Sequence, residues 1–197
     1  MQSLLNKAFF YNLWSTLYCK HASKAIANII LQKKNARVLD LACGTGRLRK
    51  GLPSCAYSGM DENESYIEYA KENFQGDFIS GNILSFKKYF KAETFDFFVI
   101  CGVFHHLPDK VAANFMDSLV NVVDKNTKII IIDHVKSHEL TWFNKLLLKF
   151  DRGKFMRDEN EYMGLFKDLK IASRDFITVK YFGLIFWHST IFVLEKR

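Results

Sequence analysis

The stretch VLDLACGTGRL, residues 38–48, decides which fold class we expect for this chain. An apolar run that contains Asp40 turns directly into small residues and two glycines, Gly44 and Gly46. Glycine has no Cβ atom, so it can adopt positive φ angles and lets a ligand come close to the backbone. The pattern predicts a strand, a ligand-binding turn and a helix. Many such turns contain glycines for steric reasons alone, so other residues must identify the ligand.

Short apolar runs and helical patterns alternate after this turn. Runs that are apolar on both faces are typical of parallel strands covered on both sides. The tail differs, because two apolar runs are joined by a short connection at Gly183, which predicts an antiparallel hairpin at the sheet edge. The sequence therefore predicts an α/β fold with an open, doubly wound, mostly parallel sheet. The expected strands are 37–41, 56–60, 77–80, 95–101, 128–133, 174–182 and 190–194, and the expected helices include 62–73 and 109–123. The buried side of the first of these helices is expected to consist of Tyr66, Ile67, Tyr69 and Ala70.

We expect one domain, because the chain has 197 residues and no linker rich in proline, serine or glycine. Its parts would be an N-terminal helical cap (1–34), a cofactor-binding core (36–135), a helical substrate lid (137–170) and the hairpin (174–195). The four cysteines have no metal-binding spacing, so we expect no metal site. Each stands in apolar or helical sequence as a free thiol would, so we expect the protein to be in the reducing cytoplasm. No secretory signal and no apolar run of about 18 residues is apparent.

The net charge of +7 is concentrated at the N-terminus, where residues 1–37 contain six basic and no acidic side chains. The rest of the chain is close to balanced, which argues against a broad nucleic-acid surface. Apolar residues at helical spacing in 4–31 predict amphipathic helices. This segment could close over a bound ligand, with Tyr11 among its aromatic contacts. Alternatively, it could make a peripheral contact with an anionic membrane.

Polar residues after the next two strands indicate what the turn binds. Asp61 ends the second strand, where a carboxylate can accept hydrogen bonds from both ribose hydroxyls, although it could instead cap the next helix. Asn82 follows the third strand, where its amide can pair with a purine edge or can simply form a turn. Arg49 stands where the dinucleotide-binding fingerprint has its third glycine, which argues against a dinucleotide as the ligand. Asp40 suits a ligand with an ammonium or sulfonium charge better than a pyrophosphate.

Five segments in consecutive order, which together span about residues 36–135, resemble the successive motifs of class I S-adenosylmethionine-dependent methyltransferases. They are VLDLACGTG, YSGMDENESYIEYAK, GDFISGNIL, FDFFVICGVFHHLPD and IIIIDHVKS. The HHL segment after the fourth strand is most similar to the bacterial small-molecule branch of that family. The resemblance implies a Rossmann-like, seven-stranded sheet and S-adenosylmethionine as the cofactor.

The resemblance also implies where the cofactor binds. Gly44 and Gly46, in the turn with Asp40 and Ala42, would line its methionine portion, and Asp61 would bind the ribose. Asn82 and Ile83 would contact the adenine, and Cys101 would lie near the donated methyl group. Ala42 replaces the first glycine of the family's loop, which should be tolerated if the φ angle is negative there, and Asn82 replaces the commoner aspartate.

The candidate catalytic residues are three histidines, His105 and His106 after the fourth strand and His134 after the fifth. Histidine titrates near neutrality and can accept a proton from a methyl acceptor. One histidine of the pair could instead cap a turn or pack under the cofactor. We expect Asp133 to be a structural carboxylate at the end of its strand.

The acceptor is predicted to be a small molecule, hydrophobic or similar to a lipid or metabolite. The apolar segment 140–150 would be a lid or part of the core, and Arg152, Lys154 and Arg157 would hold an anionic substrate group or form a solvated loop. The NPPY segment associated with enzymes that methylate amino groups of nucleic acids and proteins is absent, and CGVF occupies its place. This argues against methylation of the amino groups of nucleic-acid bases. Two alternatives remain: a non-catalytic, Rossmann-like nucleoside-binding module, and an RNA or protein methyltransferase that docks through the basic N-terminus.

Overall fold

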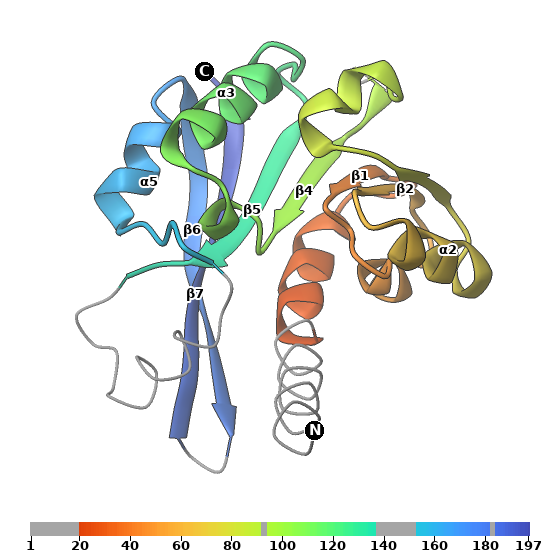
Figure 1. The fold of residues 1–197 in the computed structure, drawn as a ribbon, viewed down its shortest axis with the longest axis horizontal. Helices are drawn as coiled ribbons and strands as arrows, with labels where there is room; N and C mark the ends of the chain where they lie inside the picture. Colours follow the sequence, from red (N-terminus) through yellow and green to blue (C-terminus); the bar gives the residue numbers. More distant parts are fainter. Residues whose placement is uncertain (1–19, 92–93, 137–152, 182–183) are drawn as a thin grey trace.

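The computed structural model describes residues 20–91, 94–136, 153–181 and 184–197, which form an α/β domain around one seven-stranded sheet (Figure 1). The strand order is β3-β2-β1-β4-β5-β7-β6. Strands β1 to β5 pair in parallel, whereas β7 is antiparallel to β5 and to β6. The strands are β1 (Arg37–Leu41), β2 (Ala56–Asp61), β3 (Asp77–Ser80), β4 (Phe97–Cys101), β5 (Lys128–His134), β6 (Leu169–Tyr181) and β7 (Leu184–Lys196). The predicted fold class is confirmed.

The chain reverses its direction of travel across the sheet between β1 and β4. It proceeds outward from β1 to β2 and β3 and then returns to place β4 on the other side of β1. A crevice forms at such a point, outside the carboxyl ends of the strands, because neighbouring connections leave on opposite faces of the sheet. The turn after β1 therefore lies where a ligand is expected.

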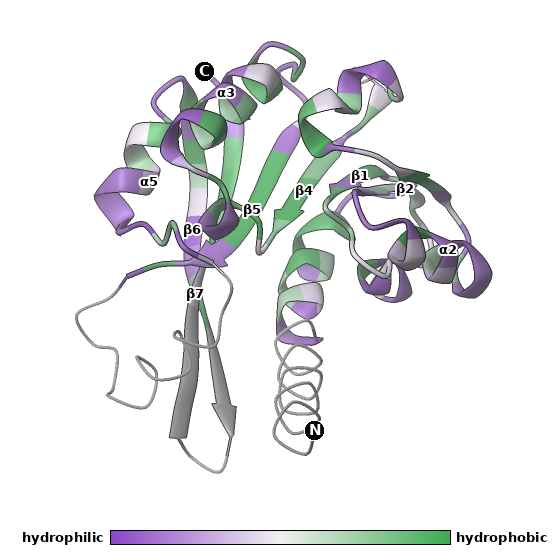
Figure 2. Ribbon diagram, viewed as in Figure 1, coloured by the Kyte–Doolittle hydropathy of each residue, from purple (hydrophilic) through white to green (hydrophobic). Residues whose placement is uncertain are grey.

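Helical segments cover both faces of the sheet (Figure 1). The helix at 20–30, the turn η1 (Arg47–Gly51) and α2 (Glu64–Asn73) cover one face. The turn η2 (Ile83–Lys88), α3 (Asp109–Val120) and α5 (Glu159–Leu165) cover the other. Neighbouring strand residues divide between these two cores, Val38 to the first and Leu39 to the second. This explains why β1, β4 and β5 are apolar throughout most of their length (Figure 2).

The helix α2 corrects one prediction. Only Ile67 and Ala70 are buried in it, whereas Tyr66 and Tyr69, which were also expected inside, are each 46% exposed. Residues three apart lie on one face of a helix, and the contact with the sheet is only that wide here. Asn63 caps the helix by accepting hydrogen bonds from the amides of Ser65 and Tyr66.

The C-terminal hairpin lies at the sheet edge, as predicted, but its strands are longer than the predicted ones. Each contains 13 residues, and β6 already begins at Leu169, within the segment expected to be mainly helical. Of the predicted cap and lid, residues 1–19 with Tyr11 and residues 137–152 lie outside the described part of the chain. Among the helices that the structure describes, none combines the length and the apolar character needed to cross a lipid bilayer.

Candidate functional site

The candidate residues converge at the carboxyl ends of four neighbouring strands. The turn 42–46 follows β1, Asp61 ends β2, Cys101 ends β4, and Asp133 and His134 end β5. Parallel pairing brings these ends to one edge of the sheet. The site predicted from residues far apart in the sequence is therefore one continuous region of the structure.

The backbone of the turn after β1 bends sharply through three residues with positive φ angles. Ala42 has a φ of 65°, Gly44 of 54° and Gly46 of 73°. The amides of Ala42 and Cys43 both donate to the carbonyl of Met60, at 2.7 and 3.0 Å. The condition for tolerating an alanine at position 42, a negative φ, is therefore not met. A residue with a Cβ atom therefore occupies the left-handed region, at a cost of roughly 1 kcal/mol or more.

The two glycines of the turn are required for different reasons. A Cβ atom on Gly46 would lie 3.0 Å from side-chain atoms of both Ala70 and Phe78, so Gly46 allows the turn to pack closely on α2 and β3. A Cβ atom on Gly44 would meet nothing within 4 Å, so only its φ angle demands glycine. The open space beside Gly44 is what a ligand that approaches the backbone needs.

Asp61 is held in place by the backbone on both sides of its carboxylate. The amide of Gly44 donates to Oδ2 at 2.8 Å, and the amide of Asn63 donates to Oδ1 at 3.0 Å. The alternative that Asp61 caps α2 is wrong, because Asn63 is the capping residue. A carboxylate has about four acceptor positions, so both oxygens keep capacity for a pair of hydroxyl donors. The geometry fits the ribose role that the sequence predicted for Asp61.

Asp40 is buried beneath the turn and accepts a hydrogen bond from the Tyr57 hydroxyl of β2. The pKa of Asp40 is raised to about 7, chiefly because burial desolvates the carboxylate; the bond from Tyr57 opposes the rise, and the Asp61 carboxylate adds to it. This site favours a ligand with a positive charge near the turn, since that charge would favour the ionised carboxylate. Tyr57 was not predicted as a site residue, because a tyrosine in a strand is expected to pack in the core. No local pattern in the sequence indicates that its hydroxyl binds Asp40.

Asn82 caps the turn η2 and is exposed, with its side-chain oxygen accepting a hydrogen bond from the amide of Leu84 at 2.8 Å. The turn-forming interpretation is therefore confirmed. Ile83, the first residue of η2, is half-buried. An amide oxygen can accept a second hydrogen bond, so the cap leaves the adenine role of Asn82 and Ile83 as a prediction.

The three candidate histidines form one cluster at the ends of β4 and β5. The ring centroids of His105 and His106 are 4.0 Å apart, and those of His105 and His134 are 4.7 Å apart. His105 is only 3% exposed, whereas His106 is exposed to solvent. His134 is buried, and its Nδ1 atom lies 2.8 Å from the Ser189 hydroxyl of β7. The HHL segment and the end of β5 thus belong to one site.

The buried carboxylate of Asp133 organises this cluster. Its Oδ1 atom lies 2.5 Å from Nδ1 of His105, and its Oδ2 atom accepts hydrogen bonds from the amides of Phe104 and His105 at 2.5 and 3.3 Å. Burial acts to raise the pKa of Asp133, but His105, His134 and their hydrogen bonds outweigh burial, so its pKa is lowered. Asp133 is therefore a structural carboxylate, as predicted, and it also orients a candidate catalytic side chain.

Arg157 corrects a second prediction. It is 3% exposed, and all five of its N–H groups are engaged within the protein. The acceptors are Asp109 Oδ1, which binds two of them, and the backbone carbonyls of Phe104, Phe155 and Leu107. Arg157 thus has no donor left for an anionic substrate group. Lys154 is exposed, and Arg152 and the apolar segment 140–150 lie outside the described residues.

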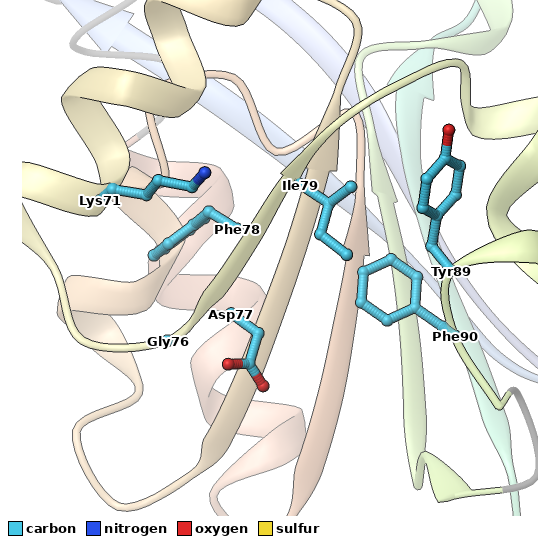
Figure 3. A pocket seen from close by; sticks show the side chains of 7 residues that line it. All are labelled: Lys71, Gly76, Asp77, Phe78, Ile79, Tyr89 and Phe90. Carbon is cyan, nitrogen blue, oxygen red and sulfur yellow. The ribbon is translucent and has the colours of Figure 1, made fainter.

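A separate hollow lies along the edge strand β3 (Figure 3). Lys71 and Phe78 lie on one side of the strand, and Ile79 faces Tyr89 and Phe90 on the other. Its lining begins at Gly76, at the amino end of the strand, whereas the candidate site uses carboxyl ends. We therefore assign this hollow no part in the chemistry. In the described part of the chain, no group of three or more histidine, cysteine, aspartate or glutamate side chains could hold a metal ion.

The cysteine at the end of β4, Cys101, is half-buried. Cys43, within the turn, is also half-buried, and burial followed by the nearby carboxylates of Asp40 and Asp61 raises the pKa of its thiol far above the usual value. The thiolate is the nucleophilic form of cysteine, so Cys43 is unsuited to nucleophilic chemistry here. The contact of Cys101 with a donated methyl group stays a prediction.

Comparison with known proteins gives consistent matches. A family described as "Methyltransferase domain" matches residues 32–183. The ribosomal RNA small subunit methyltransferase C of Buchnera aphidicola subsp. Schizaphis graminum is 29% identical over 97 residues, which are 41% of this chain and 29% of that protein. The chain thus matches less than a third of this relative's length.

Solved structures with the same fold cover nearly all of this chain. Magnesium protoporphyrin IX methyltransferase from Synechocystis PCC 6803, crystallised with S-adenosylhomocysteine (SAH), has a TM-score of 0.74 and 16% identity, with 99% of this chain and 100% of that chain covered. The plantazolicin methyltransferase BpumL, in complex with a pentazolic desmethylPZN analogue and SAH, has a TM-score of 0.68 and 16% identity, with 98% of this chain and 90% of that chain covered.

Proposed function

This chain belongs to the methyltransferase domain family, and from that premise we propose that it transfers a methyl group from S-adenosylmethionine to a small organic acceptor. One observation carries the proposal: the Asp61 carboxylate, held by the Gly44 amide, and the histidine cluster at His105 and His106 lie at the same edge of the sheet, where the strands end. The first can hold the donor, and the second can meet the acceptor.

Two structural neighbours support a small acceptor. One is named as a magnesium protoporphyrin IX methyltransferase, and the other is a plantazolicin methyltransferase crystallised with a pentazolic desmethylPZN analogue. Each match extends over at least 98% of this chain and at least 90% of the other protein's chain. An acceptor that is hydrophobic or similar to a lipid or metabolite is therefore the class to test first. The identity of the acceptor atom, oxygen, carbon or nitrogen, is left to that test.

We assign the donor site to the turn after β1 and to Asp61. Bound S-adenosylmethionine supplies an electrophilic methyl group on a sulfonium and leaves as SAH. The open space beside Gly44 admits the donor to the backbone, and Asp61, oriented by two amides, accepts hydrogen bonds from the ribose. Burial favours the protonated form of Asp40, and the positive charges of a bound cofactor would shift this carboxyl to the ionised form that suits them. These residues bind and orient, which is the main requirement for an in-line displacement.

We assign the acceptor side to His106, which is the exposed member of the cluster. As the acceptor forms its new bond to the methyl group, its proton passes to a ring nitrogen of His106. The buried ring of His105 packs against the ring of His106, with the two ring centroids 4.0 Å apart. Because an ionised carboxylate only accepts hydrogen bonds, Nδ1 of His105 is the donor to Asp133, and this bond fixes the orientation of His105. His134 packs behind His105 and is bonded to Ser189, so it is a support rather than a base.

The test is a transfer assay with methyl-labelled S-adenosylmethionine and a panel of small hydroxyl, carboxyl, amine and acidic-carbon acceptors. With the best acceptor, His106→Gln is expected to lower kcat by about 10²- to 10⁴-fold and to leave SAH affinity within twofold. Lys125→Met, an exposed site that has no part in the candidate site, is the matched control and should change neither quantity.

Two results would contradict this proposal. Specific SAH binding without transfer to any acceptor would favour the non-catalytic nucleoside-binding module. Transfer to ribosomal RNA, with binding that weakens steeply as salt rises, would favour the nucleic-acid alternative, which the partial match to an rRNA methyltransferase motivates.

A further inference from the structure

The histidine turn is held by the protein from two opposite sides. This turn is η4 (Phe104–His106), together with Leu107. On one side, Asp133 at the end of β5 accepts the amide hydrogens of Phe104 and His105. On the other side, the segment Gly153–Arg157 donates to the carbonyls of Phe104, His105 and Leu107. A short turn with both its amides and its carbonyls engaged has little freedom to move.

Arg157 supplies most of the second set of contacts. Its guanidinium group donates to the carbonyls of Phe104 and Leu107, each at 2.7 Å, and to Asp109 at 2.7 and 3.1 Å. The amide of Phe155 donates to the carbonyl of His105 at 3.0 Å. The planar fork of arginine binds several acceptors in a fixed arrangement, which a lysine ammonium cannot reproduce.

The same segment is anchored to the sheet. The carbonyl of Arg157 accepts a hydrogen bond from the amide of Lys136 at 2.9 Å, and Arg157 forms a parallel bridge with Val135. Arg157 therefore connects three parts of the site: the end of β5, the histidine turn, and the beginning of α3 at Asp109. The ion pair with Asp109 adds little by itself, because the Asp109 side chain is 88% exposed. The contacts to buried carbonyls are the ones that define the position of the turn.

Gly153 brings this segment into direct contact with His105. A Cβ atom at Gly153 would lie 2.1 Å from Cδ2 and 3.0 Å from Cγ of the His105 ring, and 3.1 Å from the His105 carbonyl oxygen. His105 is buried and bonded to Asp133, so its ring cannot move aside without loss of that bond. Any side chain at position 153 must displace either the ring or the segment.

We propose that Arg157 is a positioning residue for methyl transfer and that, with the side-chain-free Gly153, it fixes His105 and thereby sets where His106 meets the acceptor. This inference rests on the proposed function of the histidines. Arg157 touches neither donor nor acceptor, and it acts through the histidine turn. The side chains of the donor site, Asp40 and Asp61, are not among its hydrogen-bond partners, so changes at Arg157 should separate acceptor chemistry from donor binding.

The test compares Arg157→Lys and Gly153→Ala with the intact protein and with Lys125→Met, an exposed control outside the candidate site. The full chain, labelled with ¹³C at histidine Cε1 and saturated with SAH, is followed by NMR across pH 5 to 9. His105→Gln and His106→Gln spectra assign the two signals, and the exposed His21 serves as an internal reference. SAH affinity is measured by calorimetry, and kcat and KM are measured with the best acceptor of the panel.

We expect Arg157→Lys and Gly153→Ala to shift or broaden the His105 and His106 signals and to move the pH profile of kcat. We also expect both to lower kcat at least tenfold, while the SAH Kd stays within twofold and the His21 signal is unchanged. Gly153→Ala keeps every Arg157 hydrogen bond donor, so it tests the same positioning if Arg157→Lys folds poorly. Unchanged His105 and His106 signals in both variants would overturn the inference.

A second result would overturn it as well. If both variants weaken SAH binding as much as they lower kcat, Arg157 and Gly153 support the fold in general and do not position the histidines. If the intact protein methylates no acceptor, the proposed function fails, and the histidine signals still report whether the segment positions the turn.

Discussion

The buried pair of Asp40 and Tyr57 predicts that the protein becomes less stable as the pH rises from 4 to 7. Burial raises the pKa of Asp40 from 3.8 to about 7, although the hydrogen bond from Tyr57 opposes this. The folded protein therefore prefers the protonated carboxyl more strongly than the unfolded chain does. The stability from this preference is fully present below about pH 4, and it is lost as the pH rises through 7.

The size of the effect follows from the two pKa values. The pKa rises by about three pH units, and each is equivalent to about 1.4 kcal/mol, so about 4 kcal/mol of the free energy of unfolding is lost between pH 4 and 8. Asp40→Asn keeps a side-chain oxygen to accept the Tyr57 hydroxyl and removes the titration. We expect the stability of this variant, relative to the intact protein, to increase by about 4 kcal/mol over that range.

The assay is urea unfolding followed by far-UV circular dichroism at pH 4, 5, 6, 7 and 8. Tyr57→Phe is the second variant, because loss of the hydroxyl removes the bond that favours the ionised carboxylate. In that variant the loss of stability should continue above pH 7. If the difference between Asp40→Asn and the intact protein is constant within 1 kcal/mol from pH 4 to 8, the argument from burial is refuted.

Three further predictions concern the cofactor site. Asp61→Ala should weaken SAH binding by about 1–3 kcal/mol in calorimetry, because it leaves ribose hydroxyls and the Gly44 amide without their acceptor, while exposed Asp77→Ala should not; equal affinities would remove Asp61 from the site. Ala42→Gly should raise the free energy of unfolding by about 1 kcal/mol, because it relieves the positive φ, and a loss of stability in urea would contradict this. Deletion of residues 1–20 should weaken SAH binding in lipid-free buffer if the basic N-terminal segment caps the site; retained affinity together with flotation of the intact protein on anionic vesicles would favour membrane contact instead.

Much of the site could be predicted because parallel strands bring their carboxyl ends together. Asp61, Cys101 and Asp133 each stand at or near the end of a readable apolar run, so their meeting required only the strand order. The glycine turn was recognisable for the same reason. Tyr57 and Ser189 were missed, since each reaches its partner, Asp40 or His134, through a side-chain contact between strands that local patterns do not encode.

The sequence by itself determined the α/β class, the order of strands and helices, the hairpin and the strand-end positions of the donor site. These follow from hydrophobic periodicity and turn chemistry, which act over a few neighbouring residues. Only the tertiary structure decided three features: the positive φ of Ala42, the exposure of Tyr66 and Tyr69, and the burial of Arg157 among backbone carbonyls. Each depends on what packs against the residue from a distant part of the chain. A charged residue in a polar segment is expected to be solvated, and only the fold shows that two of the five Arg157 donors bind the carbonyls of a turn some 50 residues away.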